Sequence, residues 1–122
     1  MSTRSLAAAA RAGAPIFAAL GDDTRLRIVA KLSATGPLSI VRLTAGEDMT
    51  RQAITKHLSV LADAGLVRDV RRGRERLWAL EPAPLETARH YLDLVSKRWD
   101  DALARLATLV EADDHDPGPT KT

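Results

Sequence analysis

The stretch TRQAITKHLSVLADAGLV, residues 50–67, limits the fold more than any other part of the chain. On a helical wheel at about 100° per residue, Ile54, Leu58 and Leu61 fall on one face, with Ala53 and His57 at its margin. The opposite arc has no carboxylate before position 63, and its polar residues are Arg51, Gln52, Thr55, Lys56 and Ser59. The stretch therefore predicts an amphipathic helix over residues 50–64, with one face packed on a core and one donor-rich face left exposed.

Local signals place other helices before this one. Thr50 is a good N-cap for it, and Gly65 is a typical left-handed residue after its end. A short helix is expected over residues 39–45, with residues 46–49 as a tight turn. Further upstream we expect a helix starting at Pro15 and ending before Gly21. Another should begin after Asp22 or Asp23 and end before Gly36-Pro37, with a helical repeat of apolar residues at Leu26, Val29 and Leu32.

The chain after the amphipathic helix changes character. Residues 66–80 have β-branched and aromatic side chains on both sides of Arg72-Gly73-Arg74, which predicts a β-hairpin with Gly73 at a basic tip. Pro82 and Pro84 are expected to break the chain, and a long helix should follow over residues 85–111. That helix carries apolar residues at alternating spacings of three and four, a pattern that predicts a partner helix. These residues are Leu92, Val95, Trp99, Ala102, Leu106 and Leu109.

Length and composition indicate the number of domains and exclude several kinds of chemistry. A length of 122 residues predicts one domain, here residues 14–111, between a flexible segment 1–13 and a disordered acidic tail 112–122. Apolar residues make up 45% and aromatic residues 3%, which favours mainly helical packing. The chain has no cysteine, so disulfides and thiolate chemistry are excluded. No apolar run approaches the roughly 20 residues that span a bilayer, so we expect a cytoplasmic protein without a membrane segment.

Basic charge is concentrated where the polar helix face and the hairpin lie. Residues 50–76 hold seven Arg or Lys residues against three Asp or Glu residues, whereas the whole chain has a net charge of only +2. Arg and Lys can donate to guanine edges or phosphates, Gln can pair with adenine, and Thr can contact a thymine methyl group. A polar arc by itself is more often a solvated face. Here two helices across a tight turn are followed by an Arg-rich hairpin, and that combination indicates docking on double-stranded DNA.

Three stretches resemble the ArsR-type winged helix-turn-helix repressors. They are LGDDTRLRIVAKL (20–32), TRQAITKHLSVLADAGLV (50–67) and RRGRERLWAL (71–80), and the resemblance covers about residues 15–110. It implies a mainly α fold with a small β-hairpin, and a homodimer that binds an inverted-repeat operator and represses transcription. The DNA-binding residues that it implies are Thr50, Arg51, Gln52, Thr55, Lys56 and Ser59, with Arg72, Gly73 and Arg74 at the wing tip. The dimer interface would use the first and last helices, through Phe17, Leu92, Val95, Trp99, Leu106 and Leu109.

The sequence departs from that family at its metal sites. Many members bind metals through a Cys-x-Cys pair, and the matching region here is SIVRLTAGED, without a thiol. A second family site uses Asp-x-His with later His and Glu ligands. Here Ala88 precedes His90 by two residues, and Asp101 and Ala104 stand at the later positions. We therefore expect no metal and no cofactor, with relief of repression through an unknown small-molecule effector, a partner protein or protein abundance alone.

Other functions are less well supported by the sequence. No nucleophile with its base, carboxylate pair or phosphate-binding loop has motif spacing, so an enzyme is not expected. His57 is interpreted as a hydrogen-bonded histidine in helix packing, and the DDHD run at 113–116 as a solvated acidic segment. The alternative function is a winged-helix protein-interaction module that presents its basic face to an acidic partner protein.

Overall fold

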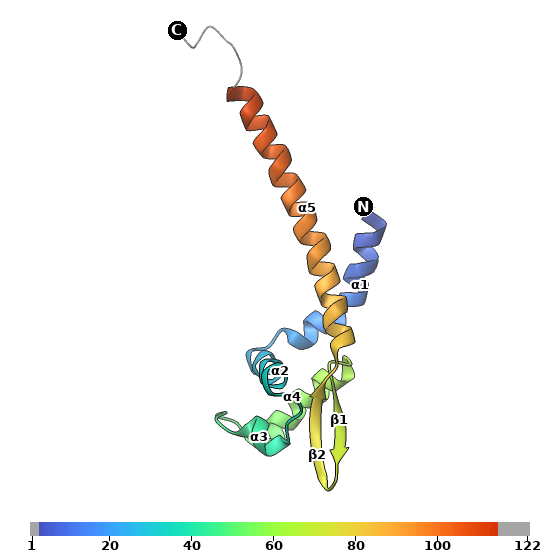
Figure 1. Ribbon diagram of the computed structural model, residues 1–122, viewed down its shortest axis with the longest axis vertical. Helices are drawn as coiled ribbons and strands as arrows, with labels where there is room; N and C mark the ends of the chain where they lie inside the picture. The colour runs from blue at the N-terminus through green and yellow to red at the C-terminus, as the bar shows by residue number, and fades with distance from the viewer. Residues whose placement is uncertain (1–2, 115–122) are drawn as a thin grey trace. The chain divides into compact units, whose positions relative to one another are not determined.

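The computed structural model describes residues 3–114, which form five helices and one two-stranded sheet (Figure 1). A compact body comprises the described residues up to Tyr91, and residues 92–114 form a second unit that consists of helix alone. The mainly helical fold with one β-hairpin confirms the predicted fold class. The elements in order are α1 (Thr3–Leu20), α2 (Asp23–Thr35), α3 (Ile40–Thr44), α4 (Arg51–Asp63), β1 (Val67–Arg72), β2 (Glu75–Leu80) and α5 (Pro82–Asp114).

The core of the body is aliphatic and joins α2, α3 and α4. Ile54, Leu58 and Leu61 of α4 are fully buried, as the wheel predicted, and they pack in one cluster with Ile28 of α2 and Leu43 of α3. Burying one such side chain stabilises the fold by about 1.5–3 kcal/mol, so this cluster fixes the back of α4 firmly to its neighbours.

The buried face of α2 differs in part from the apolar repeat in its sequence. Leu26 is 52% exposed, whereas Thr24 and Ile28 are buried together with the predicted Leu32. The buried residues follow a four-residue spacing from Thr24 through Ile28 to Leu32, which places them on one side of the helix. A threonine can occupy a buried helical position when its hydroxyl has a hydrogen-bond partner, and the Thr24 Oγ1 accepts from Arg27 Nη2 at 3.2 Å.

The first helix begins well before the predicted start. α1 starts at Thr3, so Pro15 lies inside the helix and not at its first position. The Ala-rich segment has the highest intrinsic helix propensity, and Ala9, Gly13 and Ile16 form a buried face along it. The ring of Phe17, on the same helix, packs edge-on against Tyr91, with 5.6 Å between ring centroids. Residues 3–13 are therefore helical here, and the flexibility expected of segment 1–13 stays a prediction.

The hairpin follows its prediction closely. β1 and β2 pair antiparallel from Val67 with Leu80 to Arg72 with Glu75, which leaves Gly73 and Arg74 as a two-residue loop. The φ of Gly73 is +63°, as the first loop residue of a type II′ hairpin requires. Backbone hydrogen bonds of 2.8 and 3.0 Å join Trp78 to Leu38, the second residue before α3 begins at Ile40. The hairpin is thus bonded to the segment that leads into the helix-turn-helix.

The two prolines expected to break the chain lie in the first turn of α5. Pro82 and Pro84 are tolerated there because the first amides of a helix have no intrahelical acceptor. The helix therefore begins three residues before its predicted start and continues through Asp114. Residues 115–122, which include most of the predicted acidic tail, lie outside the described residues. Within residues 3–114, no helix is both long and apolar enough to cross a membrane.

Candidate nucleic-acid interface

The helix-turn-helix consists of α3, a turn over residues 45–50, and α4. Thr50 has extended backbone angles of −75° and 161°, and its Oγ1 accepts a hydrogen bond of 3.1 Å from the Ala53 amide. This is the predicted N-cap, and it starts α4 at Arg51. The remaining first-turn amides give this end of the helix a partial positive charge, which suits a phosphate oxygen.

The polar arc of α4 is open to solvent. Within the described residues, Arg51, Gln52 and Lys56 make no hydrogen bond or ion pair through their side chains, so their donors are available to a ligand. The Thr55 hydroxyl donates to the Arg51 carbonyl at 2.8 Å and keeps its acceptor capacity. All five residues of the predicted face are exposed: Arg51, Gln52, Thr55, Lys56 and Ser59.

Ile40 of α3 adds an apolar element to this polar face. It lines one open hollow of about 530 Å³ together with four residues of α4: Arg51, Gln52, Thr55 and Lys56. Sequence reasoning missed Ile40, because nothing local shows that the first residue of α3 lies beside the first turns of α4. An apolar surface next to donors is suited to a base edge that carries a methyl group.

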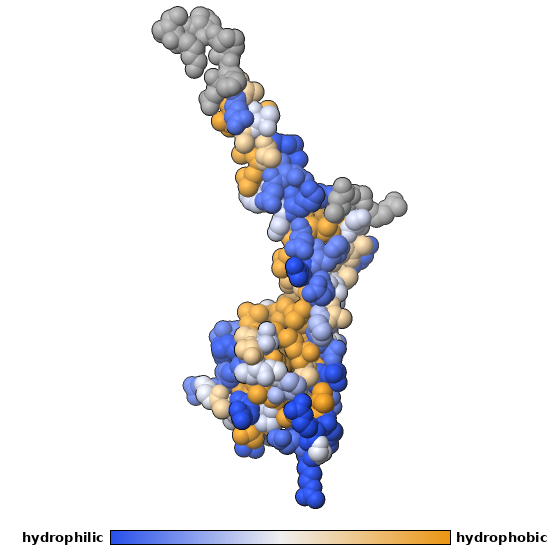
Figure 2. All heavy atoms as spheres, in the orientation of Figure 1, coloured by the Kyte–Doolittle hydropathy of each residue, from blue (hydrophilic) through white to orange (hydrophobic). Residues whose placement is uncertain are grey.

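The hairpin presents two kinds of arginine that the sequence did not distinguish. Arg76 forms an ion pair of 2.9 Å with Asp69 and stacks over the Trp78 ring at 4.8 Å, and Arg68 pairs with Glu81. Three other arginines, Arg71, Arg72 and Arg74, are exposed and have no ion pair within residues 3–114. The end of the hairpin forms a hydrophilic projection at the bottom of Figure 2. The free positive charge of the hairpin is therefore concentrated near its tip.

A second hollow, of about 350 Å³, lies between the hairpin and the start of α3. Arg42 and Arg72 line it together with Ser39 and Glu75. Arg42 was not among the predicted site residues, and the basic surface therefore extends from the hairpin to α3.

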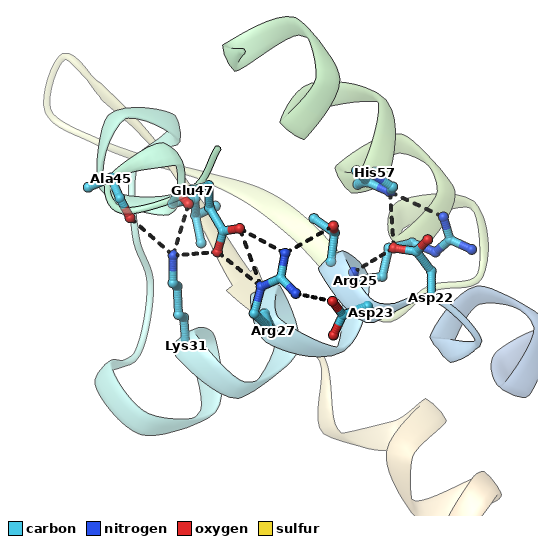
Figure 3. A network of polar contacts seen from close by, with 10 residues as sticks. Asp22, Asp23, Arg25, Arg27, Lys31, Ala45, Glu47 and His57 are labelled. Atoms are coloured by element: carbon cyan, nitrogen blue, oxygen red, sulfur yellow. Dashed lines mark hydrogen bonds and ion pairs between the residues drawn. The ribbon is translucent and has the colours of Figure 1, made fainter. Parts of the chain in front are cut away.

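The other side of α4 is held by polar contacts as well as by the core. Arg25 of α2 donates from Nη1 to His57 Nδ1 at 3.2 Å, and Asp22 Oδ2 lies 3.7 Å from the same nitrogen (Figure 3). His57 is half-buried, so its interpretation as a packing histidine is confirmed. Asp22 also accepts the Arg25 amide hydrogen bond at the start of α2. This bond and the nearby charge of Arg25 hold the pKa of Asp22 below its usual value.

The predicted stripe on α5 is exposed in the single chain. Trp99 is 64% exposed, and Leu92, Val95, Leu106 and Leu109 are also exposed. Leu103 and Val110, which the sequence analysis did not include, widen this apolar surface, and hydrophobic side chains are visible along the helix in Figure 2. Apolar exposure on this scale is unusual for an isolated helix in water.

His90 of α5 has no metal-binding surroundings in the described structure. It is exposed, and within residues 3–114 no three His, Cys, Asp or Glu side chains come close enough together to hold a metal ion.

The fold and the exposed basic interface together define the class of protein. A helix-turn-helix whose second helix exposes unpaired donors, followed by a wing with free arginines, is a DNA-binding transcriptional regulator.

Comparison with known proteins agrees with this class. The model of a helix-turn-helix domain family matches residues 20–70. A protein of Bacillus subtilis (strain 168), an uncharacterized HTH-type transcriptional regulator called YuzN, is 47% identical over 77 residues, which are 58% of this chain and 84% of that protein. The HTH-type transcriptional regulator Rv2034 of Mycobacterium tuberculosis (strain ATCC 25618 / H37Rv) is 38% identical over 98 residues, 80% of this chain and 88% of that protein.

Solved structures agree with these relatives. An ArsR-like transcriptional regulator from Rhodococcus sp. RHA1 has 34% sequence identity and a TM-score of 0.68, and the match covers 81% of this chain and 92% of that one. This chain belongs to the ArsR family of helix-turn-helix transcriptional regulators. The resemblance stated from the sequence is thus confirmed. Membership in this family also confirms that the protein is not an enzyme, because the family consists of transcriptional regulators.

Proposed function

We propose that this regulator is a homodimeric repressor that binds an inverted-repeat operator. The observation that supports sequence-specific binding most directly is the exposed arc of α4, where Arg51, Gln52 and Lys56 have donors without partners in the described part of the chain. Arg51 and Gln52 lie in the first turn and are assigned to base edges in the major groove. Thr55 and Lys56 serve bases or phosphates, with Thr50 and Ser59 at the margins of the same surface.

The wing supplies contacts that do not depend on sequence. Arg72 and Arg74 flank Gly73 at the hairpin tip and have no ion pair in the described structure. Guanidinium groups of this kind bind the phosphate backbone or enter the minor groove. The protein therefore reads bases through α4 and gains affinity through the wing.

The dimer is proposed from the apolar surface of α5. Together with Ala102, the exposed residues Leu92, Val95, Trp99, Leu106 and Leu109 follow a spacing of alternately three and four residues, which places them along one seam. A second copy of the same helix offers the same surface, so a two-fold interface would cover both. Phe17 of α1 is assigned to this interface as well, although its ring already packs on Tyr91 within the chain.

Repression follows from occupancy of a promoter by such a dimer. One relative, from Escherichia coli (strain K12), is described as the arsenical resistance operon repressor and is 36% identical over 67 residues. The protein-interaction alternative has no observation in its favour beyond the basic face that DNA binding also uses.

The test measures the oligomeric state of the protein and its affinity for duplexes with one or two half-sites. Sedimentation at micromolar concentration is expected to show a dimer, and a duplex with two symmetric half-sites one helical turn apart should bind more tightly than a single half-site. Leu106→Asp should yield a monomer that no longer distinguishes the two duplexes. Ala104→Asp adds the same charge two residues away, outside the stripe, and should remain a dimer. A wild-type monomer, or equal affinity for both duplexes, would refute the proposed dimeric mode.

A further inference from the structure

The turn between α3 and α4 is held from behind by α2. Glu47 lies in this turn, and its side chain is only 6% exposed. Its carboxylate accepts hydrogen bonds from Arg27 Nη2 at 2.9 Å and from Lys31 Nζ at 3.1 Å, both on α2 (Figure 3). A carboxylate with little exposure is held in one orientation when a cationic donor binds each of its oxygens, as Arg27 binds Oε1 and Lys31 binds Oε2 here.

Lys31 connects the same point to the end of α3. Its Nζ also donates to the carbonyl of Leu43 at 3.2 Å and to that of Ala45 at 3.3 Å. The last carbonyls of a helix lack intrahelical donors, so the ammonium group completes the end of α3. One side chain of α2 thus ties together the C-terminal end of α3 and the turn that leads to α4.

The charges in this cluster are internally balanced. Arg27 pairs with Asp23 as well as with Glu47, so two cations face two carboxylates. The hydrogen bonds from Arg27 and Lys31 lower the pKa of Glu47, and those to Glu47 and Asp23 raise the pKa of Arg27. Arg27 and Lys31 are therefore occupied within the fold, in contrast to Arg51 and Lys56 of α4, which have no ion pair within residues 3–114.

We propose that Glu47 is a positioning residue for sequence readout: through Arg27 and Lys31 it sets the placement of the first turn of α4 against base edges. This inference rests on the proposed operator binding. Thr50, the N-cap of α4, is three residues after Glu47, so movement of the turn is transmitted directly to Arg51 and Gln52. Hydrogen bonds to base edges depend steeply on distance and angle, whereas attraction to phosphates is long-ranged and tolerates displacement. Loosening the turn should therefore reduce specific binding and spare non-specific binding.

The experiment compares two affinities of the same folded protein. The specific probe is a duplex enriched from a random library by the wild-type protein, and the non-specific probe is a scrambled duplex of equal length. Glu47→Gln is expected to lower the ratio of specific to non-specific affinity by about tenfold, the discrimination of roughly one base contact. Asp23→Asn is the matched control, because it removes the same charge from the exposed partner of Arg27 and leaves the turn contacts in place.

The ratio separates positioning from a general role in folding. A smaller folded fraction would lower both affinities equally, and that result, like an unchanged ratio, would overturn the proposal. If Glu47→Gln fails to fold, Lys31→Met provides the same test by removing the ammonium contacts, while Lys31→Arg keeps charge and donors and should retain the ratio. If the wild-type protein shows no preference for any enriched duplex, the proposed operator binding fails together with this inference. A wild-type preference that Glu47→Gln leaves intact would refute only the positioning role.

Discussion

Arg25 of α2 donates a hydrogen bond of 3.2 Å to Nδ1 of His57, on the buried side of the helix that carries the DNA-binding face. The same guanidinium donates from Nε to the carbonyl of Ala19 near the end of α1. One side chain therefore joins three helices, and α4 is braced by polar contacts at its middle as well as by Glu47 before its start. A helix fixed at two points can present its opposite face to DNA with little loss of conformational freedom on binding.

Replacement of Arg25 tests this brace. Arg25→Met should lower the free energy of unfolding by about 1–3 kcal/mol, because the Ala19 carbonyl and His57 lose a charged donor. Arg42→Met changes an exposed side chain in the same way and is expected to stay within about 0.5 kcal/mol of the wild type. Urea denaturation followed by circular dichroism measures both. Equal stability of the two variants would mean that the Arg25 contacts contribute nothing net.

Acid should weaken the fold through Glu47 and Asp22. The pKa of each is lowered in the folded protein, from ordinary values of 4.5 for Glu47 and 3.8 for Asp22. Between the folded and unfolded pKa values the unfolded chain binds more protons. The stabilisation is therefore complete above the ordinary pKa and is lost as pH falls through the folded one.

We accordingly expect the melting temperature to fall steeply on acidification below about pH 4.5, the ordinary pKa of glutamate. Glu47→Gln should make this decline shallower, since its amide does not titrate. Glu86→Gln, on the exposed surface of α5, should leave the decline unchanged. A wild-type slope in the Glu47 variant would show that this carboxylate does not contribute to acid sensitivity.

Base readout is tested at Arg51 and Gln52. Each alanine variant should reduce discrimination against changed base pairs at its own contact position, by about 1–3 kcal/mol for each residue. Lys97→Ala removes a positive charge from α5 and should leave the preference intact. Selection from a random duplex library, sequenced for each variant, gives the comparison. Identical enriched sequences for wild type, Arg51→Ala and Gln52→Ala would exclude both residues from the reading surface.

The two kinds of wing arginine give a charge-matched test. Arg72→Ala with Arg74→Ala should weaken all duplexes similarly and reduce the salt dependence of log K by about one for each phosphate that the wing no longer binds. Arg68→Ala with Arg76→Ala removes the same charge from residues already paired with Glu81 and Asp69, so its effect on the slope should be smaller. Affinity titrations over a range of salt concentrations measure the slopes. Equal slopes for the two double variants would contradict the assignment of DNA contact to the wing tip.

Local signals in the sequence were enough to predict the elements that depend on neighbouring residues. The period of Ile54, Leu58 and Leu61 defined the buried side of α4, Thr50 fixed its first turn, and Gly73 placed the hairpin loop. These signals are local, because helix periodicity, capping and turn geometry involve residues only a few positions apart. The exposed face of α4 followed from the same periodicity without knowledge of the rest of the fold.

Which residues meet across the chain became known only from the folded arrangement of the helices. That arrangement buried Thr24 and exposed Leu26 on α2, brought Arg25 to His57, and brought Glu47 to Arg27 and Lys31. Each of these contacts joins segments whose approach depends on how the aliphatic core packs, and packing is a property of all the helices together. The residues proposed to face DNA could thus be predicted from local pattern, whereas the polar contacts of Arg25 and Glu47 that brace them could not.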